Sequence, residues 1–198
     1  MRKRTAFGQW LSKQKGNITK EKFSEEIGFG IDTMDGWLYR GVRPRLVNAM
    51  QIVRRLEACG QGHISQVLDE AGYEVRSTDL IDRGYGSVLN FLECEELWRG
   101  DIITNPPFKL SAEFIRKSLS LVGVGQRVIF FQRLNFLESA KRFALFQEFP
   151  IQYVYVHASR VGTAMGGDFE RYHAKSMAYA WYVWKRGYDG HTVMRWIP

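Results

Sequence analysis

Residues 101–108 read DIITNPPF, and this stretch decides how the rest of the sequence is interpreted. Residues 101–104 are short and rich in β-branched side chains, so they predict a strand that ends at Asn105. Two prolines follow, and proline does not continue a central strand because it lacks a backbone N–H group. The pattern therefore predicts a strand that stops abruptly and presents a stiff loop, closed by Phe108, at its carboxyl end.

Strand-like and helix-like segments alternate around this stretch. The predicted strands are 73–77 (ending at Asp79), 127–131, 151–157 and 177–184, and the predicted helices are 111–121 and 138–149. This alternation is typical of an α/β fold with a mostly parallel, doubly wound sheet. Ligands of such sheets bind beyond the carboxyl ends of the strands. We therefore expect Asn105 at the carboxyl end of a central strand, facing a cleft that Gly60 and Asp79 also line.

Residues 1–57 show helical spacing of apolar side chains and predict a small all-α head. Thr19 is the expected N-cap of a helix that Gly28 ends, and a second short helix is expected over 32–39. Two helices joined by a short glycine-containing turn form helix-turn-helix geometry. The spacing resembles phage-repressor-like helix-turn-helix domains, and the expected domains are this head and a body over 58–198.

Positive charge is concentrated in the head. Residues 1–58 hold twelve Lys or Arg against six Asp or Glu, whereas the remainder holds sixteen against fifteen. A basic head on a near-neutral body indicates DNA as a partner. However, the helix that reads bases in the resembling family carries Asp32 and Asp35 here, and carboxylates repel phosphate. The alternative is a head that only packs, or that makes weak phosphate contacts through Arg40, Arg43 and Arg45.

Other classes of protein are disfavoured by composition. The two cysteines, Cys59 and Cys94, give neither a disulfide framework nor the ligand spacing of a metal site. The basic start at 1–4 is not followed by a continuous apolar run, so we expect no signal peptide and no membrane span. The expected location is the cytoplasm of a bacterial or phage-infected cell.

The loop at 105–108 suits chemistry on an exocyclic aromatic amine, which is a poor nucleophile because its lone pair is delocalised into the ring. The side-chain carbonyl of Asn105 and the backbone carbonyl of Pro106 can each accept one amine hydrogen, which localises the lone pair for attack on a methyl sulfonium. Pro106 and Pro107 hold the two acceptors at fixed positions. Phe108 can stack on a base taken out of the duplex.

With this loop, the body resembles the phage and bacterial adenine-N6 DNA methyltransferases, and more narrowly a small phage-type class. The similar stretches are 58–63 (ACGQGH), 77–86 (STDLIDRGYG), 101–108, 133–138 (RLNFLE) and 180–184 (AWYVW). The resemblance implies a Rossmann-like methyltransferase sheet, S-adenosyl-L-methionine as the cofactor and DNA as the partner. It also implies catalytic roles for Asn105, Pro106, Pro107 and Phe108.

The resemblance further implies where the cofactor binds. Glycines of the first motif would form the turn over its methionine end, Asp79 would accept from the ribose hydroxyls, and Asn90 and Phe91 would lie at its adenine ring. The implied cofactor-binding residues are Glu57, Cys59, Gly60, Gly62, Asp79, Leu80, Asn90 and Phe91. Arg133 and Asn135 would lie near the catalytic loop, without an assigned role.

The first cofactor motif departs from the family pattern. The family places three residues between an acidic residue and the first glycine, whereas Glu57 and Gly60 are separated by two. The preceding segment, 51–56, contains two arginines and predicts a helix, which does not suit a central buried strand. Either 51–58 becomes that strand in the fold, or the body lacks it and binds the cofactor poorly.

Three functions are therefore open. The first is an active adenine-N6 DNA methyltransferase, and the intact catalytic loop favours it. The second is a DNA-binding or regulatory protein with a degenerate, non-catalytic methyltransferase body, and the altered first motif favours it. The third is a methyltransferase that acts on a glutamine side chain or on cytosine N4; the basic head favours nucleic acid over a protein substrate.

Overall fold

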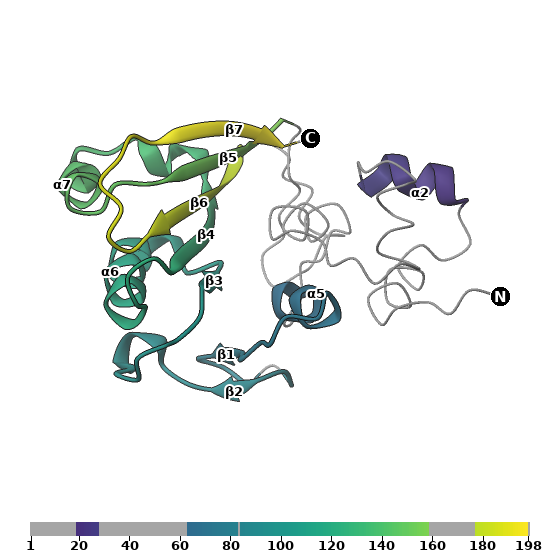
Figure 1. The fold of residues 1–198 in the computed structure, drawn as a ribbon, viewed down its shortest axis with the longest axis horizontal. Helices are drawn as coiled ribbons and strands as arrows, with labels where there is room; N and C mark the ends of the chain where they lie inside the picture. Colours follow the sequence, from purple (N-terminus) through teal and green to yellow (C-terminus); the bar gives the residue numbers. More distant parts are fainter. Residues whose placement is uncertain (1–18, 28–62, 83, 159–176, 198) are drawn as a thin grey trace. The chain divides into compact units, whose positions relative to one another are not determined.

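The computed structural model describes residues 19–27, 63–82, 84–158 and 177–197 (Figure 1). The chain divides into two compact units, residues 1–88 with 164–168 and residues 89–163 with 169–198. The predicted domain boundary at 57/58 and the second helix of the head lie outside the described residues. So do seven predicted site residues: Arg40, Arg43, Arg45, Glu57, Cys59, Gly60 and Gly62.

The described residues of the first unit form two short helices and a pair of short strands. Helix α2 (Lys20–Ile27) begins after Thr19, whose Oγ1 accepts a hydrogen bond from the backbone N–H of Lys22 at 3.2 Å. This contact confirms the N-cap predicted from the sequence, because an N-cap hydroxyl satisfies a free N–H group of the first turn. Helix α5 (His63–Glu70) was not predicted.

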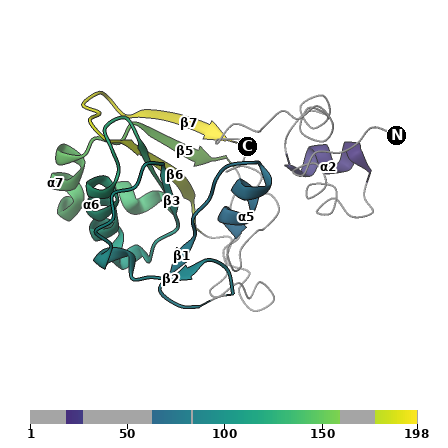
Figure 2. The same ribbon diagram turned by 60° about the horizontal axis from the view of Figure 1, so that its bottom comes forward.

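Strands β1 (Thr78–Asp79) and β2 (Ser87–Val88) run parallel to each other, as Figure 2 shows. The prediction of a strand over 73–77 was wrong. Those residues alternate in exposure, as strand residues do, but the pairing that the structure describes begins only at Thr78. The alternation of exposed and less exposed residues therefore indicated an extended backbone, whereas the position of β2 determined which residues pair.

The second unit is built around a five-stranded sheet in the order β3-β4-β6-β5-β7. Its strands are β3 (Ile102–Thr104), β4 (Arg127–Arg133), β5 (Tyr153–His157), β6 (Tyr179–Lys185) and β7 (Val193–Ile197). Its helices are the 3-10 helices η1 (Phe91–Glu93), η2 (Phe108–Leu110) and η3 (Leu134–Leu137) and the α-helices α6 (Ser111–Leu121) and α7 (Ala140–Glu148). Strands β3, β4, β5 and β7 run parallel, and β6 is reversed between β4 and β5. The mixed sheet with its helices is an α/β fold, as predicted.

The predicted elements agree with this unit in most places. Helix α6 has the predicted bounds, and β3, β4, β5 and β6 lie on the predicted strands. Helix α7 begins at Ala140 instead of 138, because Glu138 is the C-cap of η3. Strand β7 was missed, because its exposed, mixed residues lack the alternation of a half-buried strand. Strand β3 stands at one end of the described strand order, where a central strand was expected.

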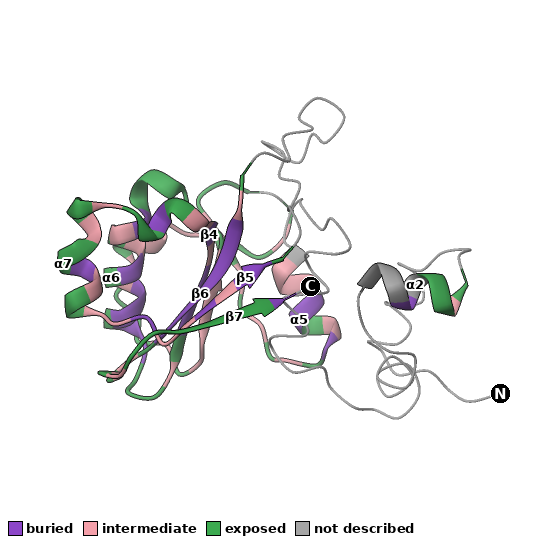
Figure 3. Cartoon of the chain, turned by 90° about the horizontal axis from the view of Figure 1, so that it is seen from above, coloured by how far each residue is buried: buried purple, intermediate pink, exposed green. Residues whose placement is uncertain are grey.

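The hydrophobic core lies between the sheet and the two α-helices. Figures 1 and 3 show α6 and α7 on the same side of the sheet. The core joins buried residues of both helices and of three strands: Ile115, Leu119, Leu145, Val128, Phe130, Val154, Val156, Ala180, Tyr182 and Trp184. Among the described residues of this unit, both α-helices therefore cover one face of the sheet. Among the described residues, no helix is long and apolar enough to cross a membrane.

The register of β3 against β4 is fixed by an ion pair at the amino ends of the two strands. The carboxylate of Asp101 accepts from the backbone N–H of Arg127 at 2.7 Å and from its Nε at 2.8 Å. Thr104 then pairs with Phe130, so the residues that follow both strands emerge at the same edge. The acidic residue of the DIITNPPF stretch thus aligns the strand at the end opposite to Asn105.

Candidate active site at the carboxyl edge of the sheet

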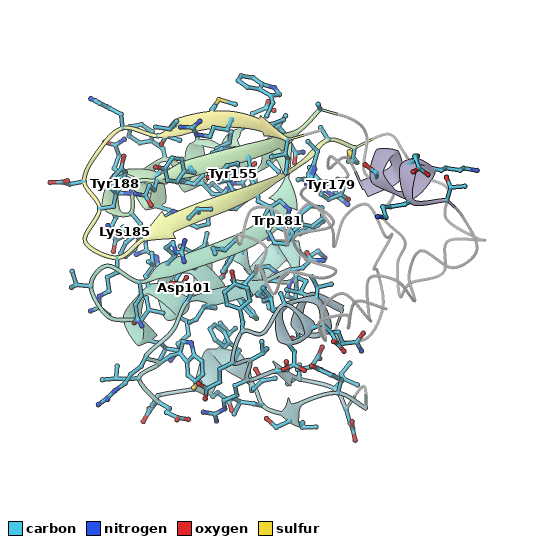
Figure 4. The ribbon with its side chains drawn as sticks, turned by 45° about the vertical axis from the view of Figure 1, so that its right-hand side comes forward. Asp101, Tyr155, Tyr179, Trp181, Lys185 and Tyr188 are labelled. Carbon is cyan, nitrogen blue, oxygen red and sulfur yellow. The ribbon has the colours of Figure 1, made fainter. Side chains whose placement is uncertain are left out.

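Four segments meet at the carboxyl edge of the five-stranded sheet. Asn105 follows β3, Arg133 ends β4 and His157 ends β5, and these three strands are parallel. The reversed strand β6 begins at this edge with Tyr179, which pairs with Arg133. Figure 4 shows Tyr179 at one end of β6 and Lys185 at the other. This edge is therefore where the predicted catalytic loop and the RLNFLE stretch come together.

The predicted catalytic loop is anchored at Pro106, and its two predicted acceptors make no described hydrogen bond. Asn105 is exposed while Pro106 is buried, which anchors the loop against the protein. The next two carbonyls are engaged: Pro107 O accepts from the Leu110 N–H at 2.9 Å, and Phe108 O accepts from the Ser111 hydroxyl at 2.9 Å. Within the described part of the chain, no hydrogen bond uses the Asn105 amide or the Pro106 carbonyl. These are the two acceptors that the amine chemistry requires.

The ring of Phe108 is 37 % exposed and is held by two neighbours. The guanidinium carbon of Arg133 lies 4.9 Å from the ring centroid, and the Tyr179 ring lies 6.3 Å away at an angle of 46°. Tyr179 in turn stacks on Phe131 at 5.1 Å with the two rings nearly parallel. A cation over an aromatic face is attracted by the ring's quadrupole, so Arg133 and Tyr179 together orient Phe108.

The backbone beneath Arg133 is fixed from two sides. The Tyr182 hydroxyl donates to the Arg133 carbonyl at 3.0 Å and to the Leu134 carbonyl at 3.3 Å. The Leu134 N–H donates to the Ala178 carbonyl at 2.8 Å. Burial raises the pKa of the Tyr182 phenol well above its ordinary value, so the hydroxyl keeps the proton that it donates.

The turn that carries Asn135 is held by a second arginine. Arg142 donates through Nε to the Phe136 carbonyl at 2.7 Å, and through Nη2 to the carbonyls of Asn135 and Glu138 at 3.2 Å each. Its guanidinium carbon lies 4.7 Å from the Phe136 ring centroid. These contacts use only the backbone carbonyl of Asn135. The Asn135 side chain is exposed and takes no part in them.

A cavity of about 470 Å³ opens at this edge. Its described lining is Arg133, Leu134, Asn135, Leu137, Glu138, Met177 and Ala178. Its size falls in the range of small-ligand sites, which combine apolar walls with a few polar groups. Since Arg133 both lines the cavity and lies over Phe108, the cavity adjoins the catalytic loop.

The described cofactor-site residues belong to two places. Asp79 ends β1, and its Oδ1 accepts from the Ile81 N–H at 3.0 Å, while the Leu80 side chain is 66 % exposed. Asn90 caps η1: its Oδ1 accepts from the Leu92 N–H at 3.2 Å and its Nδ2 donates to Glu93 at 2.7 Å.

The amide of Asn90 is thus occupied within its own turn. The Phe91 ring stacks on Phe114 in the first turn of α6, with centroids 5.3 Å apart. Because α6 follows the catalytic loop directly, Phe91 lies beside the helix that the loop leads into.

Sequence reasoning missed several residues that support the carboxyl edge around the predicted catalytic loop. Arg133 and Asn135 were named without a role, whereas Tyr179, Met177 and Arg142 were not singled out. Tyr179 lies 71 positions and Met177 lies 69 positions beyond Phe108 in the printed sequence. The antiparallel pairing of β6 with β4 brings Tyr179 opposite Arg133. No local pattern in the sequence carries that information.

Comparisons with known proteins give distant likenesses only. No family model matches the chain, and no curated protein matches it. One similar solved structure is protein Atu636 of Agrobacterium tumefaciens, described as a predicted O-methyltransferase, with 15% identity, a TM-score of 0.40 and alignment over 77% of this chain and 64% of that one. Another is M1.HpyAVI in complex with SAM, with 16% identity, a TM-score of 0.26 and alignment over 52% of this chain and 59% of that one.

This chain thus spans less than two thirds of the length of either structure. At these TM-scores neither likeness decides the fold or the function.

Proposed function

We propose that this protein is an S-adenosyl-L-methionine-dependent methyltransferase that methylates the N6 amine of adenine in DNA. The observation that supports it most is the loop at 105–108, which follows a strand at the carboxyl edge with the Asn105 amide exposed and the Pro106 ring buried. Two carbonyl acceptors that no described hydrogen bond uses, on a backbone stiffened by two prolines, suit activation of an aromatic amine, because the acceptors must meet the amine without reorganising.

The two acceptors act on the amine hydrogens. The side-chain oxygen of Asn105 and the backbone oxygen of Pro106 each accept one N–H of the amine, which draws the nitrogen toward a tetrahedral geometry. The nitrogen lone pair then forms the new bond to the methyl carbon as the sulfur–carbon bond breaks and its electron pair stays on sulfur. The nitrogen afterwards loses one proton to solvent. Phe108, held by Arg133 and Tyr179, supplies the stacking surface for the base.

The described residues fit the cofactor in part. S-Adenosyl-L-methionine would supply an electrophilic methyl group on a positively charged sulfur. Asp79 ends its strand with one carboxylate oxygen in a local turn, and a carboxylate is an acceptor of the kind that a ribose hydroxyl needs. Phe91 offers an aromatic surface for an adenine ring. Asn90 fits less well, because both ends of its amide are already engaged with η1.

The experiment that tests the proposal has two arms on the full-length protein. Isothermal titration with S-adenosyl-L-methionine measures cofactor binding, and incubation of unmethylated duplex DNA with labelled cofactor, followed by nucleoside analysis, identifies the methylated base. The proposal expects saturable cofactor binding and N6-methyladenine.

Methyl label found in N4-methylcytosine or in added protein would show that the substrate is cytosine or a protein and not adenine. Absence of both binding and transfer would favour the regulatory alternative.

A further inference from the structure

Arg133 differs in its contacts from four other arginines of the same unit. Arg116 pairs with Glu148, Arg127 pairs with Asp101, Arg142 donates to three backbone carbonyls, and Arg186 donates to the carbonyl of Ser120 at 3.1 Å. Within the described residues, the Arg133 guanidinium makes no ion pair, and its Nε is buried without a hydrogen-bond partner. Its described contact is the Phe108 ring.

A buried N–H donor without a partner, such as the Arg133 Nε, is unfavourable unless a ligand accepts from it. A guanidinium carries five N–H donors in its plane and stays protonated in proteins. Stacking on a ring uses the face of the group and leaves the in-plane donors available, and those donors match the oxygens of a phosphate. An arginine without a described counter-charge beside the loop at 105–108 is therefore a candidate site for an anion.

The position of Arg133 relates this anion site to the reacting base. Arg133 lies three positions beyond the β4 residue that pairs with Thr104, and Asn105 lies one position beyond Thr104. With strands about 4.8 Å apart and a rise of about 3.3 Å per residue, the two Cα atoms are separated by about 8 Å. That separation is comparable to the extent of one nucleotide from its base to its phosphate.

We propose that the cavity at the carboxyl edge receives the target nucleotide, with Arg133 binding a phosphate of that nucleotide while it holds Phe108 in position for stacking. This inference rests on the proposed function and adds to it how the DNA substrate is bound. Arg133 is a positioning residue for Phe108 and a binding residue for the strand. Glu138 lines the same cavity, and its carboxylate repels phosphate, so the phosphate lies on the Arg133 side while the base stacks on Phe108.

The test measures binding of a fluorescein-labelled single-stranded oligonucleotide of mixed sequence to the full-length protein over a series of salt concentrations. For single strands, the slope of log K against log salt decreases by about 0.7 for each phosphate contact that is lost. Arg133→Met should therefore give a shallower slope by about 0.7, and Arg133→Lys should restore the wild-type slope because it keeps the charge.

The matched control is Arg116→Met, which makes the same change at an arginine that also lies over a ring, Phe149, at 5.5 Å. It should leave the slope unchanged. Circular dichroism melting of each variant identifies any loss of folding.

A slope for Arg133→Met equal to that of the wild type and of Arg116→Met would overturn the assignment of Arg133. If the slope difference is present but the wild-type protein transfers no methyl group to DNA, the proposed function fails and the anion site stands. If the wild-type protein binds no oligonucleotide at all, both fail.

Discussion

The two regions proposed to carry out methyl transfer are built on very different supports. The catalytic loop at 105–108 extends from a sheet whose strands are backed by a hydrophobic core, and its neighbours Tyr179, Trp181 and Tyr182 are almost fully buried. Asp79 stands at the end of a pair of two-residue strands whose side chains at Ser87 and Val88 are exposed. The comparison indicates that the proposed catalytic loop is held by packing, whereas Asp79, the proposed ribose-binding residue, is held by a short backbone ladder.

The different supports predict different sensitivities to mutation. A loop held by buried strands changes position only when the core changes, so its own substitutions should affect chemistry and not folding. A segment held by four paired residues should be sensitive to a single added methyl group. Four substitutions, taken from the largest expected effect to the smallest, test this contrast.

Phe130→Ala should have the largest effect, because Phe130 is fully buried in the core beneath the catalytic edge. Removing a buried aromatic side chain costs about 3–5 kcal/mol through lost burial and the cavity left behind. Urea unfolding monitored by tryptophan fluorescence measures the change. The control is Phe143→Ala on α7, a residue 64 % exposed, which should change the free energy of unfolding by less than about 0.5 kcal/mol.

Equal losses for the two phenylalanine variants would show that the core does not lie where the structure places it.

Asn105→Ala should lower the methyl-transfer rate about 10²–10³-fold, the usual effect of removing one preorganised polar group that acts in the transition state. Affinity for S-adenosyl-L-methionine should stay within twofold, because the amide acts on the substrate amine. Single-turnover rates and isothermal titration measure the two quantities. The control, Gln147→Ala, removes an exposed amide from α7 and should leave both unchanged. A variant that retains most of its rate would remove Asn105 from the mechanism.

Gly86→Ala tests the weaker support. Gly86 has φ of 81°, and an added Cβ would lie 2.4 Å from the backbone oxygen of Ser77, which also accepts from the Ser87 N–H. The strands β1 and β2 must therefore separate, and we expect cofactor affinity to fall about tenfold, or roughly 1.4 kcal/mol.

The matched control is Gly84→Ala, which has φ of 72° but open space around the added Cβ. It carries the backbone strain of about 1–2 kcal/mol without the clash, so isothermal titration should show a smaller loss of affinity. If both glycine variants bind the cofactor equally, the β1–β2 pairing does not position Asp79 for the cofactor.

Tyr182→Phe should have the smallest effect. It removes the hydrogen bonds to the Arg133 and Leu134 carbonyls but keeps the ring in the core, so the free energy of unfolding should fall by about 1 kcal/mol. The control is Tyr188→Phe, which removes the bond to the exposed His191 carbonyl and should cost less. The two variants are compared by urea unfolding; a Tyr182→Phe protein as stable as the control would show that these bonds do not anchor the edge.

Much of the second unit was predictable from local sequence. The period of apolar residues located α6 with its observed bounds, and β-branched and aromatic runs located β4, β5 and β6. The NPPF loop was predicted to follow a strand, since asparagine and two prolines end a ladder for local steric reasons. These features depend on neighbours a few residues apart, which a sequence displays directly.

Other features were decided only when distant segments paired. The reversal of β6 between β4 and β5, the addition of β7 at the sheet's edge and the placement of Tyr179 beside Phe108 all depend on partners far apart along the chain. The chemistry of Arg133 is the clearest case. The sequence by itself determined that an arginine follows a buried strand. Only the tertiary structure decided that this arginine faces an aromatic ring with no counter-charge among the described residues, because charge pairing depends on which side chains the fold brings within reach.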